Sequence, residues 1–124
     1  MKAIRIPPDQ TEPITVVEVE KDYQAMARVI GGPCLYIERF RCPLTRFGLV
    51  GVCDEDGQHN GQPTNDRAWP LYPIPGYHLR GTVLVMAEGN TVDGPDFVDI
   101  TNPQVALDLV AGLLEGSPQR EDAR

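Results

Sequence analysis

Four polar side chains in the middle of the chain could bind an anionic ligand. They are Asn65, Arg67, His78 and Arg80, which lie on either side of a proline-rich segment. An asparagine amide supplies a donor and an acceptor, and an arginine guanidinium is a planar fork that matches a carboxylate or a phosphate. The four residues are therefore candidates for a site that takes a nucleotide or another anionic small molecule, in a binding protein or an enzyme. The alternative is structural: Asn65 caps a helix, Arg67 pairs with a nearby aspartate, and His78 lies on the surface.

Large apolar side chains gather in the same segment. They are Trp69, Leu71, Tyr72, Ile74 and Tyr77. Trp, Tyr and Arg are the residues that most often anchor protein interfaces, and apolar side chains exposed together form a patch that needs a partner. Trp69, Tyr72 and Tyr77 are therefore candidate binding residues. The alternative is that these rings only cap one end of a sheet.

The cysteines and histidines do not form a recognisable catalytic or metal centre. Cys34, Cys42 and Cys53 are an odd number at irregular spacing without a C-x-x-C pair, which favours reduced thiols. A zinc site built from Cys42, Cys53 and the two histidines would have suitable atoms but unsuitable spacing. The chain also lacks a nucleophile elbow, a G-x-G-x-x-G motif and a P-loop. We therefore expect no catalytic residues, no metal, no cofactor and no enzymatic activity.

Composition favours a single small acidic domain. The chain has 124 residues, a net charge of −7 and a pI of about 4.7. A nucleic-acid-binding domain usually has a pI above about 9, so we expect no direct contact with nucleic acid. No apolar run reaches the roughly 18 residues of a membrane span, and the first residues lack the apolar part of a signal peptide. We therefore expect a cytoplasmic protein that does not contact a membrane.

Acidic residues are concentrated near the C-terminus. Residues 81–115 contain six acids and no Lys or Arg; the acids are Glu88, Asp93, Asp96, Asp99, Asp108 and Glu115. If these carboxylates lined one surface at phosphate-like intervals, the protein would mimic DNA, as an anti-restriction device does. DNA mimicry is therefore a third functional hypothesis, weaker than protein binding or small-molecule binding.

The hydrophobic pattern predicts an α+β domain over residues 1–116 and a mobile tail over residues 117–124. Strands are expected over Lys2–Ile6, Ile14–Val19, Leu35–Phe40, Phe47–Cys53, Gly81–Ala87 and Phe97–Ile100. They would form a small mixed or antiparallel sheet of about five to six strands. The apolar strand Phe47–Cys53 is expected to be central, and the edge strand Ile14–Val19 could pair with a second copy to make a homodimer.

Two main helices and one short helix are expected between the strands. Asp22 would cap the first, whose apolar face is Tyr23, Met26, Ala27 and Ile30. The short helix covers Asp66–Leu71. The last helix is capped by Thr101 or by Asn102, and Gly116 ends it. Its apolar stripe is Ala106, Leu109, Val110, Leu113 and Leu114.

The order of these pieces resembles an uncharacterised family. The resemblance lies in MKAIRIP at the start, Gly31-Gly32 before a strand ending near Glu38, the turn Asp54-Glu55-Asp56-Gly57 followed by Gly61-Gln62-Pro63-x-Asn65-x-Arg67-Ala68, and Gly81-Thr82-Val83-Leu84-Val85. It covers roughly residues 1–101. The family usually has an aliphatic residue where Gln62 stands and a small or hydroxyl residue where Trp69 stands.

That family occurs in tailed phages, especially those of mycobacteria and other actinobacteria, and in bacterial genomes. It is catalogued as a domain of unknown function, so the resemblance implies no activity. It does imply a phage-type accessory protein in a bacterial cytoplasm. Together with the aromatic segment, it favours a small protein-binding module that contacts a host or phage protein.

Overall fold

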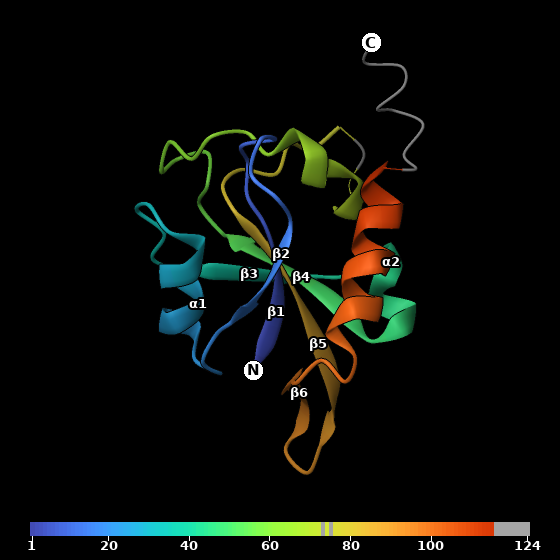
Figure 1. Ribbon diagram of the computed structural model, residues 1–124. Coiled ribbons are helices and arrows are strands. Elements are labelled where there is room, and N and C mark those ends of the chain that lie inside the picture. The colour runs from blue at the N-terminus through green and yellow to red at the C-terminus, as the bar shows by residue number, and fades with distance from the viewer. Residues whose placement is uncertain (73, 75, 116–124) are drawn as a thin grey trace.

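The computed structural model describes residues 1–72, 74 and 76–115, and the expected tail over residues 117–124 lies outside them. The described residues form a six-stranded antiparallel sheet with helices on both faces (Figure 1). The strands are β1 (Lys2–Ile6), β2 (Thr15–Glu18), β3 (Ile37–Phe40), β4 (Leu49–Asp54), β5 (Val83–Thr91) and β6 (Gly94–Val98). The expected α+β class is therefore confirmed, and the sheet is antiparallel throughout.

Strand β5 occupies the middle of the sheet, whose order is β2-β1-β5-β4-β3. Strand β4 pairs with one edge of β5, while β1 and β6 share the other edge. Strand β1 pairs with residues 83–85 of β5 and β6 with residues 87–91. As expected, β4 is an interior strand, and β2 lies at an edge of the sheet.

The two α-helices cover opposite faces of the sheet (Figure 1). Helix α1 (Tyr23–Ile30) begins at Asp22, whose carboxylate accepts a hydrogen bond from the Gln24 N–H at 2.8 Å, as predicted. Tyr23 was expected on its buried face but is 63% exposed, because only the edge of its ring reaches Phe97. Helix α2 (Pro103–Glu115) is capped by Asn102, whose side chain accepts a hydrogen bond from the Val105 N–H. Of the two predicted caps, Thr101 and Asn102, the second is therefore the one that forms.

Two 3-10 helices complete the described elements. One, η2 (Asp66–Leu71), is the short helix expected there. The other, η1 (Pro43–Phe47), was not predicted. Pro43 fixes a backbone angle suited to a first helical position, and Gly48 ends the helix with φ +80°.

The bounds predicted for the last strand, Phe97–Ile100, are wrong. The strand begins at Gly94 instead, because β5 continues to Thr91 and turns back as a hairpin.

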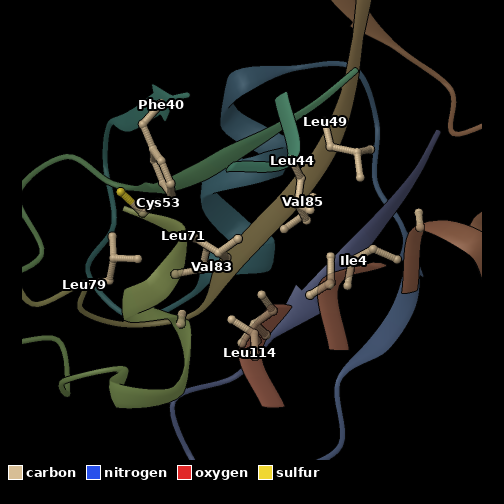
Figure 2. Close-up of a cluster of buried hydrophobic side chains, with 14 of the residues drawn as sticks. Ile4, Phe40, Leu44, Leu49, Cys53, Leu71, Leu79, Val83, Val85 and Leu114 are labelled. Carbon is tan, nitrogen blue, oxygen red and sulfur yellow. The ribbon is translucent and has the colours of Figure 1, made fainter. Parts of the chain in front are cut away.

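The side chains of each strand alternate between the two faces of the sheet, so the core consists of two clusters, one on each face. The cluster under α2 and η2 includes Ile4, Phe40, Leu71, Val83, Val85 and Leu114, as Figure 2 shows. The cluster under α1 includes Ala3, Met26, Val52, Leu84, Met86 and Phe97. Because successive residues of β5 point to opposite faces, this strand contributes to both clusters and is almost wholly buried from Val83 to Ala87.

Glycine 51 lets a large ring lie flat on the sheet. Gly51 pairs with Phe40 across β4 and β3, and a Cβ built on Gly51 would lie 2.2 Å from the Phe40 ring. That separation is far below a normal contact, and both residues are buried. The ring therefore occupies the space that any other residue at position 51 would need.

We expect Gly51→Ala to destabilise the protein and Gly112→Ala to stabilise it. The first substitution overpacks the core and should cost about 1–3 kcal/mol. Gly112 lies in α2 with nothing within 4 Å of its missing Cβ, so alanine there should gain about 0.5–1 kcal/mol from helix propensity. Urea unfolding of both variants would measure the two free energies, and a shift of the same sign in both would contradict this packing.

Candidate functional site

Three connections gather at one end of the sheet, opposite the β5–β6 hairpin (Figure 1). They are residues 7–14 between β1 and β2, residues 55–65 between β4 and η2, and residues 72–82 between η2 and β5, of which 73 and 75 are not described. We call this region the loop end. We include η2, which lies between two of these connections and carries Arg67 and Trp69. The loop end then contains all seven residues that the sequence singled out for binding.

Asn65 lies at the centre of the loop end and is completely buried. Its side-chain amide donates hydrogen bonds to the carbonyl oxygens of Ile6 and Gly81, each at 2.9 Å. It therefore joins the end of β1 to the start of β5. Asn65 precedes η2 in the capping position, but its side chain makes no capping hydrogen bond. Its Oδ1 atom has no hydrogen-bond partner among the described residues.

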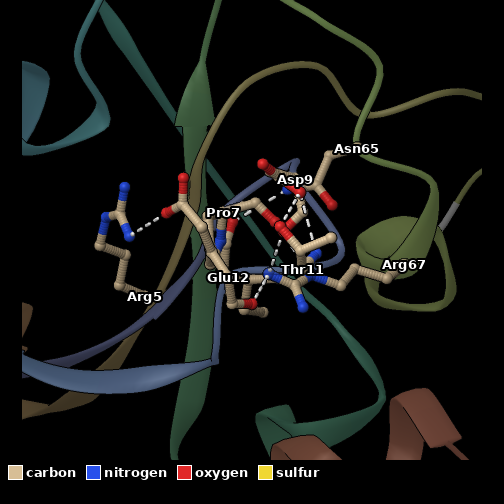
Figure 3. Close-up of polar contacts among 8 residues, drawn as sticks. Arg5, Pro7, Asp9, Thr11, Glu12, Asn65 and Arg67 are labelled. Atoms are coloured by element: carbon tan, nitrogen blue, oxygen red, sulfur yellow. Dashed lines mark hydrogen bonds and ion pairs between the residues drawn. The ribbon is translucent and has the colours of Figure 1, made fainter.

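Arg67 holds the connection between β1 and β2, as Figure 3 shows. Its Nε donates to the Pro7 carbonyl at 2.9 Å, and one terminal nitrogen donates to the carbonyls of Asp9 and Glu12 at 3.0 and 2.7 Å. A guanidinium presents several donors in a fixed plane, which suits a set of carbonyls that no strand satisfies. These three bonds orient the guanidinium toward the chain's own backbone.

A buried carboxylate organises the link after β4. Asp54 is 5% exposed and accepts hydrogen bonds from the Asp56 N–H, the Asn60 amide and the Gln62 amide at 2.9 to 3.2 Å. Gln62 also donates to the Gly31 carbonyl at 3.0 Å, which ties this link to the end of α1. Gln62 therefore joins the buried carboxylate of Asp54 to the C-terminal end of α1.

Two tyrosines stack at the edge of the loop end. The rings of Tyr72 and Tyr77 are 4.3 Å apart and nearly parallel, and Tyr72 also packs on Phe40 at 5.0 Å. The Tyr72 hydroxyl donates to the Glu38 carboxylate at 2.7 Å. Burial raises the pKa of Tyr72 well above its usual range, and the bond to Glu38 raises it further. Tyr72 is thus a neutral, half-buried support, while Tyr77 is 43% exposed.

A hollow of about 580 Å³ opens beside Tyr77. It is lined by Glu55, Asp56, Gln58, His59 and Tyr77, and we call it the acidic hollow. The Glu55 N–H donates to the Tyr36 carbonyl at 3.0 Å, which ties the hollow to the chain just before β3, where Leu35 and Tyr36 are exposed. Acidic groups, a histidine and the exposed Tyr77 ring therefore line one corner of the loop end.

The other predicted residues occupy three different environments. His78 is exposed, and Trp69 is half-buried. Arg80 is half-buried and donates to the Gln62 carbonyl at 3.4 Å, next to the short bridge between Thr64 and Arg80. Neither hollow that the described residues form is lined by Asn65, Arg67, His78 or Arg80. The side-chain hydrogen bonds of Asn65, Arg67 and Arg80 run to backbone carbonyls.

Sequence reasoning missed the four acidic-hollow residues from the link after β4. The acidic turn at Asp54–Gly57 was visible in the sequence, but nothing local indicated that it faces Tyr77, about 20 residues later. The contact arises because β4 and β5 are adjacent, so that both connections leave the sheet at the same end.

Burial makes all three thiols poor nucleophiles. It raises the pKa of Cys34 to about 11, with a further contribution from the Asp54 carboxylate. Burial also raises the pKa of Cys42 and, more strongly, of Cys53. Among the described residues, no three His, Cys, Asp or Glu side chains are grouped to hold a metal ion.

One family model matches residues 1–113, and its description is Domain of unknown function (DUF3846). The chain belongs to this family. The match spans both α1 and nearly all of α2, so it covers the whole sheet and the loop end. No curated protein and no solved structure matches the chain. No helix in the described part of the chain is long and apolar enough to cross a membrane.

We expect Asn65→Ala to destabilise the protein by about 2–3 kcal/mol, because two buried carbonyls lose their donor. Asn90→Ala is the matched control, since Asn90 is exposed in the β5–β6 hairpin and should tolerate the change within about 0.5 kcal/mol. Urea unfolding measures the free energy of unfolding of both variants. Equal small effects would mean that Asn65 does not hold the two strands together.

Cys34 should react slowly with iodoacetamide. With a pKa of about 11, roughly one thiol in a thousand is ionised at pH 8, against about a quarter for an ordinary cysteine. The alkylation rate should therefore rise about tenfold per pH unit from pH 7 to pH 10. Peptide mapping by mass spectrometry would follow Cys34 alone, and a rate that levels off near pH 8.5 would show an ordinary thiol.

Proposed function

We propose that this protein is a small phage-type accessory protein that acts by binding a host or phage protein through the loop end. The observation that carries the proposal is the exposed Tyr77 ring, supported from behind by Tyr72 and placed at the mouth of the acidic hollow. Aromatic side chains held rigidly at a surface are favoured anchors in protein interfaces. The phage character rests on the motif resemblance, and a bacterial cytoplasm is the setting that it implies.

Neighbouring side chains extend the anchor into a patch. Leu35, Tyr36 and Ile74 are 75%, 64% and 56% exposed. The Tyr36 carbonyl accepts the N–H of Glu55, a residue of the acidic hollow, and Leu35 precedes Tyr36 in the chain. Ile74 belongs to the same connection as Tyr77. Exposed apolar groups gathered in this way lose contact with water when a partner covers them, which drives association.

A small-molecule site has less support from the geometry. Two of the four residues that suggested it hold the fold instead: Asn65 donates to two carbonyls and Arg67 to three. The raised pKa values of the thiols also favour a binding role over nucleophilic catalysis.

DNA mimicry likewise has little support, because the six acids of residues 81–115 do not share one face. Glu88 pairs with Arg39 at 3.0 Å on the side of α1, whereas Asp108 and Glu115 lie on α2, across the sheet. Asp96 pairs with Lys21 at 2.6 Å, and Asp99 accepts the Lys2 N–H. Asp108 accepts a hydrogen bond from the Gln104 amide at 2.9 Å, so four of the six carboxylates already have partners within the protein.

Site-specific cross-linking tests the proposal. A photoreactive phenylalanine in place of Tyr77 should cross-link to a bacterial or phage protein, and the same group in place of Val92 should not. Val92 is fully exposed at the turn of the β5–β6 hairpin, at the far end of the sheet. The identified partner, once purified, should bind the protein at least about tenfold more weakly after Tyr77→Ala and unchanged after Val92→Ser.

The same cross-linking experiment has two outcomes that would argue against the proposal. Identical cross-links from positions 77 and 92, or equal affinity of both variants, would contradict binding through the loop end. A cross-link from position 77 to a second copy of this chain would assign the surface to a homodimer instead.

A further inference from the structure

Four carboxylates at or beside the loop end have no cationic partner among the described residues. They are Glu55 and Asp56 in the link after β4, Asp54 at the end of β4, and Glu38 on the neighbouring strand β3. Of the ion pairs in the described part of the chain, the one between Arg5 and Glu12 reaches the loop end, and none includes these four groups. Arg80, three residues after Tyr77, donates a hydrogen bond to the Gln62 carbonyl rather than to a carboxylate. The four carboxylates therefore make this corner of the molecule locally negative.

Two of the four carboxylates are accessible. Glu55 and Asp56 are exposed and line the acidic hollow, whereas Asp54 is buried under its own amide donors and Glu38 accepts the Tyr72 hydroxyl. Glu55 and Asp56 use their backbone N–H groups within the loop, to Tyr36 and Asp54 respectively. Their carboxylate oxygens are exposed and accept no hydrogen bond from the described residues, so they can receive an incoming donor.

The aromatic wall of the hollow suits a flat cation. Tyr77 places one ring face against Tyr72 and keeps 43% of its surface exposed. A guanidinium over an aromatic face is attracted by the ring's electron density. The protein already contains two such pairs, Arg39 over Phe97 at 5.1 Å and Arg46 over Phe47 at 4.8 Å.

We infer that the acidic hollow receives an arginine side chain from a basic segment of the partner protein. The guanidinium would stack on Tyr77 and donate to the Glu55 and Asp56 carboxylates, while Gln58 and His59 line the remaining wall. Arginine fits better than lysine because its planar fork can stack and form paired hydrogen bonds at the same time. This inference rests on the proposed protein-binding function and specifies the chemistry of the partner.

Short peptides test the inference without the natural partner. A glycine-rich peptide with two arginines, and the same peptide with lysine or with neutral citrulline, would be titrated into the full-length protein at low salt. Amide shifts in NMR spectra report the binding site. We expect shifts at residues 55–59 and 77, affinity in the order arginine, lysine, citrulline, and an arginine preference of about threefold to fivefold over lysine.

Matched variants separate local recognition from overall charge. Glu55→Gln with Asp56→Asn should abolish the shifts, whereas Asp93→Asn with Asp108→Asn removes the same charge elsewhere and should preserve them. Tyr77→Leu should retain charge-dependent binding but lose the preference for arginine over lysine.

Two results would overturn the arginine inference: equal binding of the three peptides, or equal effects of the two double variants. Protein binding through Tyr77 would still stand, because the cross-linking experiment does not depend on the charges at positions 55 and 56. Failure of the proposed function would be seen separately, as the absence of site-specific cross-links from position 77.

Discussion

The whole structure depends on the burial of the first half of strand β5, Val83–Ala87. Its first five residues are covered on both faces, and its two edges are hydrogen bonded to β4 on one side and to β1 and β6 on the other. Backbone groups buried in this way must be paired, so the buried residues of β5 require a neighbouring strand on each edge. Once both edges are occupied and α1 and α2 cover the faces, the connections can leave the sheet only at its ends. The loop end is the consequence.

Polar side chains hold the loop end together because its backbone has few strand partners. Asn65 and Arg67 donate to five carbonyl oxygens between them, and Gln62 bridges Asp54 to the end of α1. Buried carbonyls that lack a donor would destabilise the fold, so these side chains supply the donors that a sheet would otherwise supply. Residue types that suit a ligand site therefore serve as scaffold, and recognition falls to the exposed rim.

The distribution of charge agrees with this separation between residues that hold the fold and residues on the exposed rim. Most of the ion pairs join strands or hairpins away from the loop end, where they contribute little individually because they are exposed. The carboxylates around the acidic hollow have no such pairing among the described residues. Complementary charge of this kind mainly accelerates encounter and selects the partner, while an aromatic anchor such as Tyr77 supplies affinity.

Local pattern was sufficient to predict most of the elements. The alternation in Lys2–Ile6, the Asp22 cap and the apolar stripe of the last helix each depend on neighbours within a few residues, and all three were confirmed. The errors also have local causes. The polar second half of β5 does not resemble a strand, so its hairpin with β6 was placed three residues too late.

By itself, the sequence determined the α+β class, the edge position of β2 and the segment that contains the candidate site, because hydrophobic period and turn residues act over short distances. Only the tertiary structure decided which of those residues are scaffold and which are exposed. Asn65 meets Ile6 and Gly81, and Tyr77 meets Glu55, through strand pairings that bring distant residues together. No local pattern encodes those contacts, since they depend on the order of strands in the sheet.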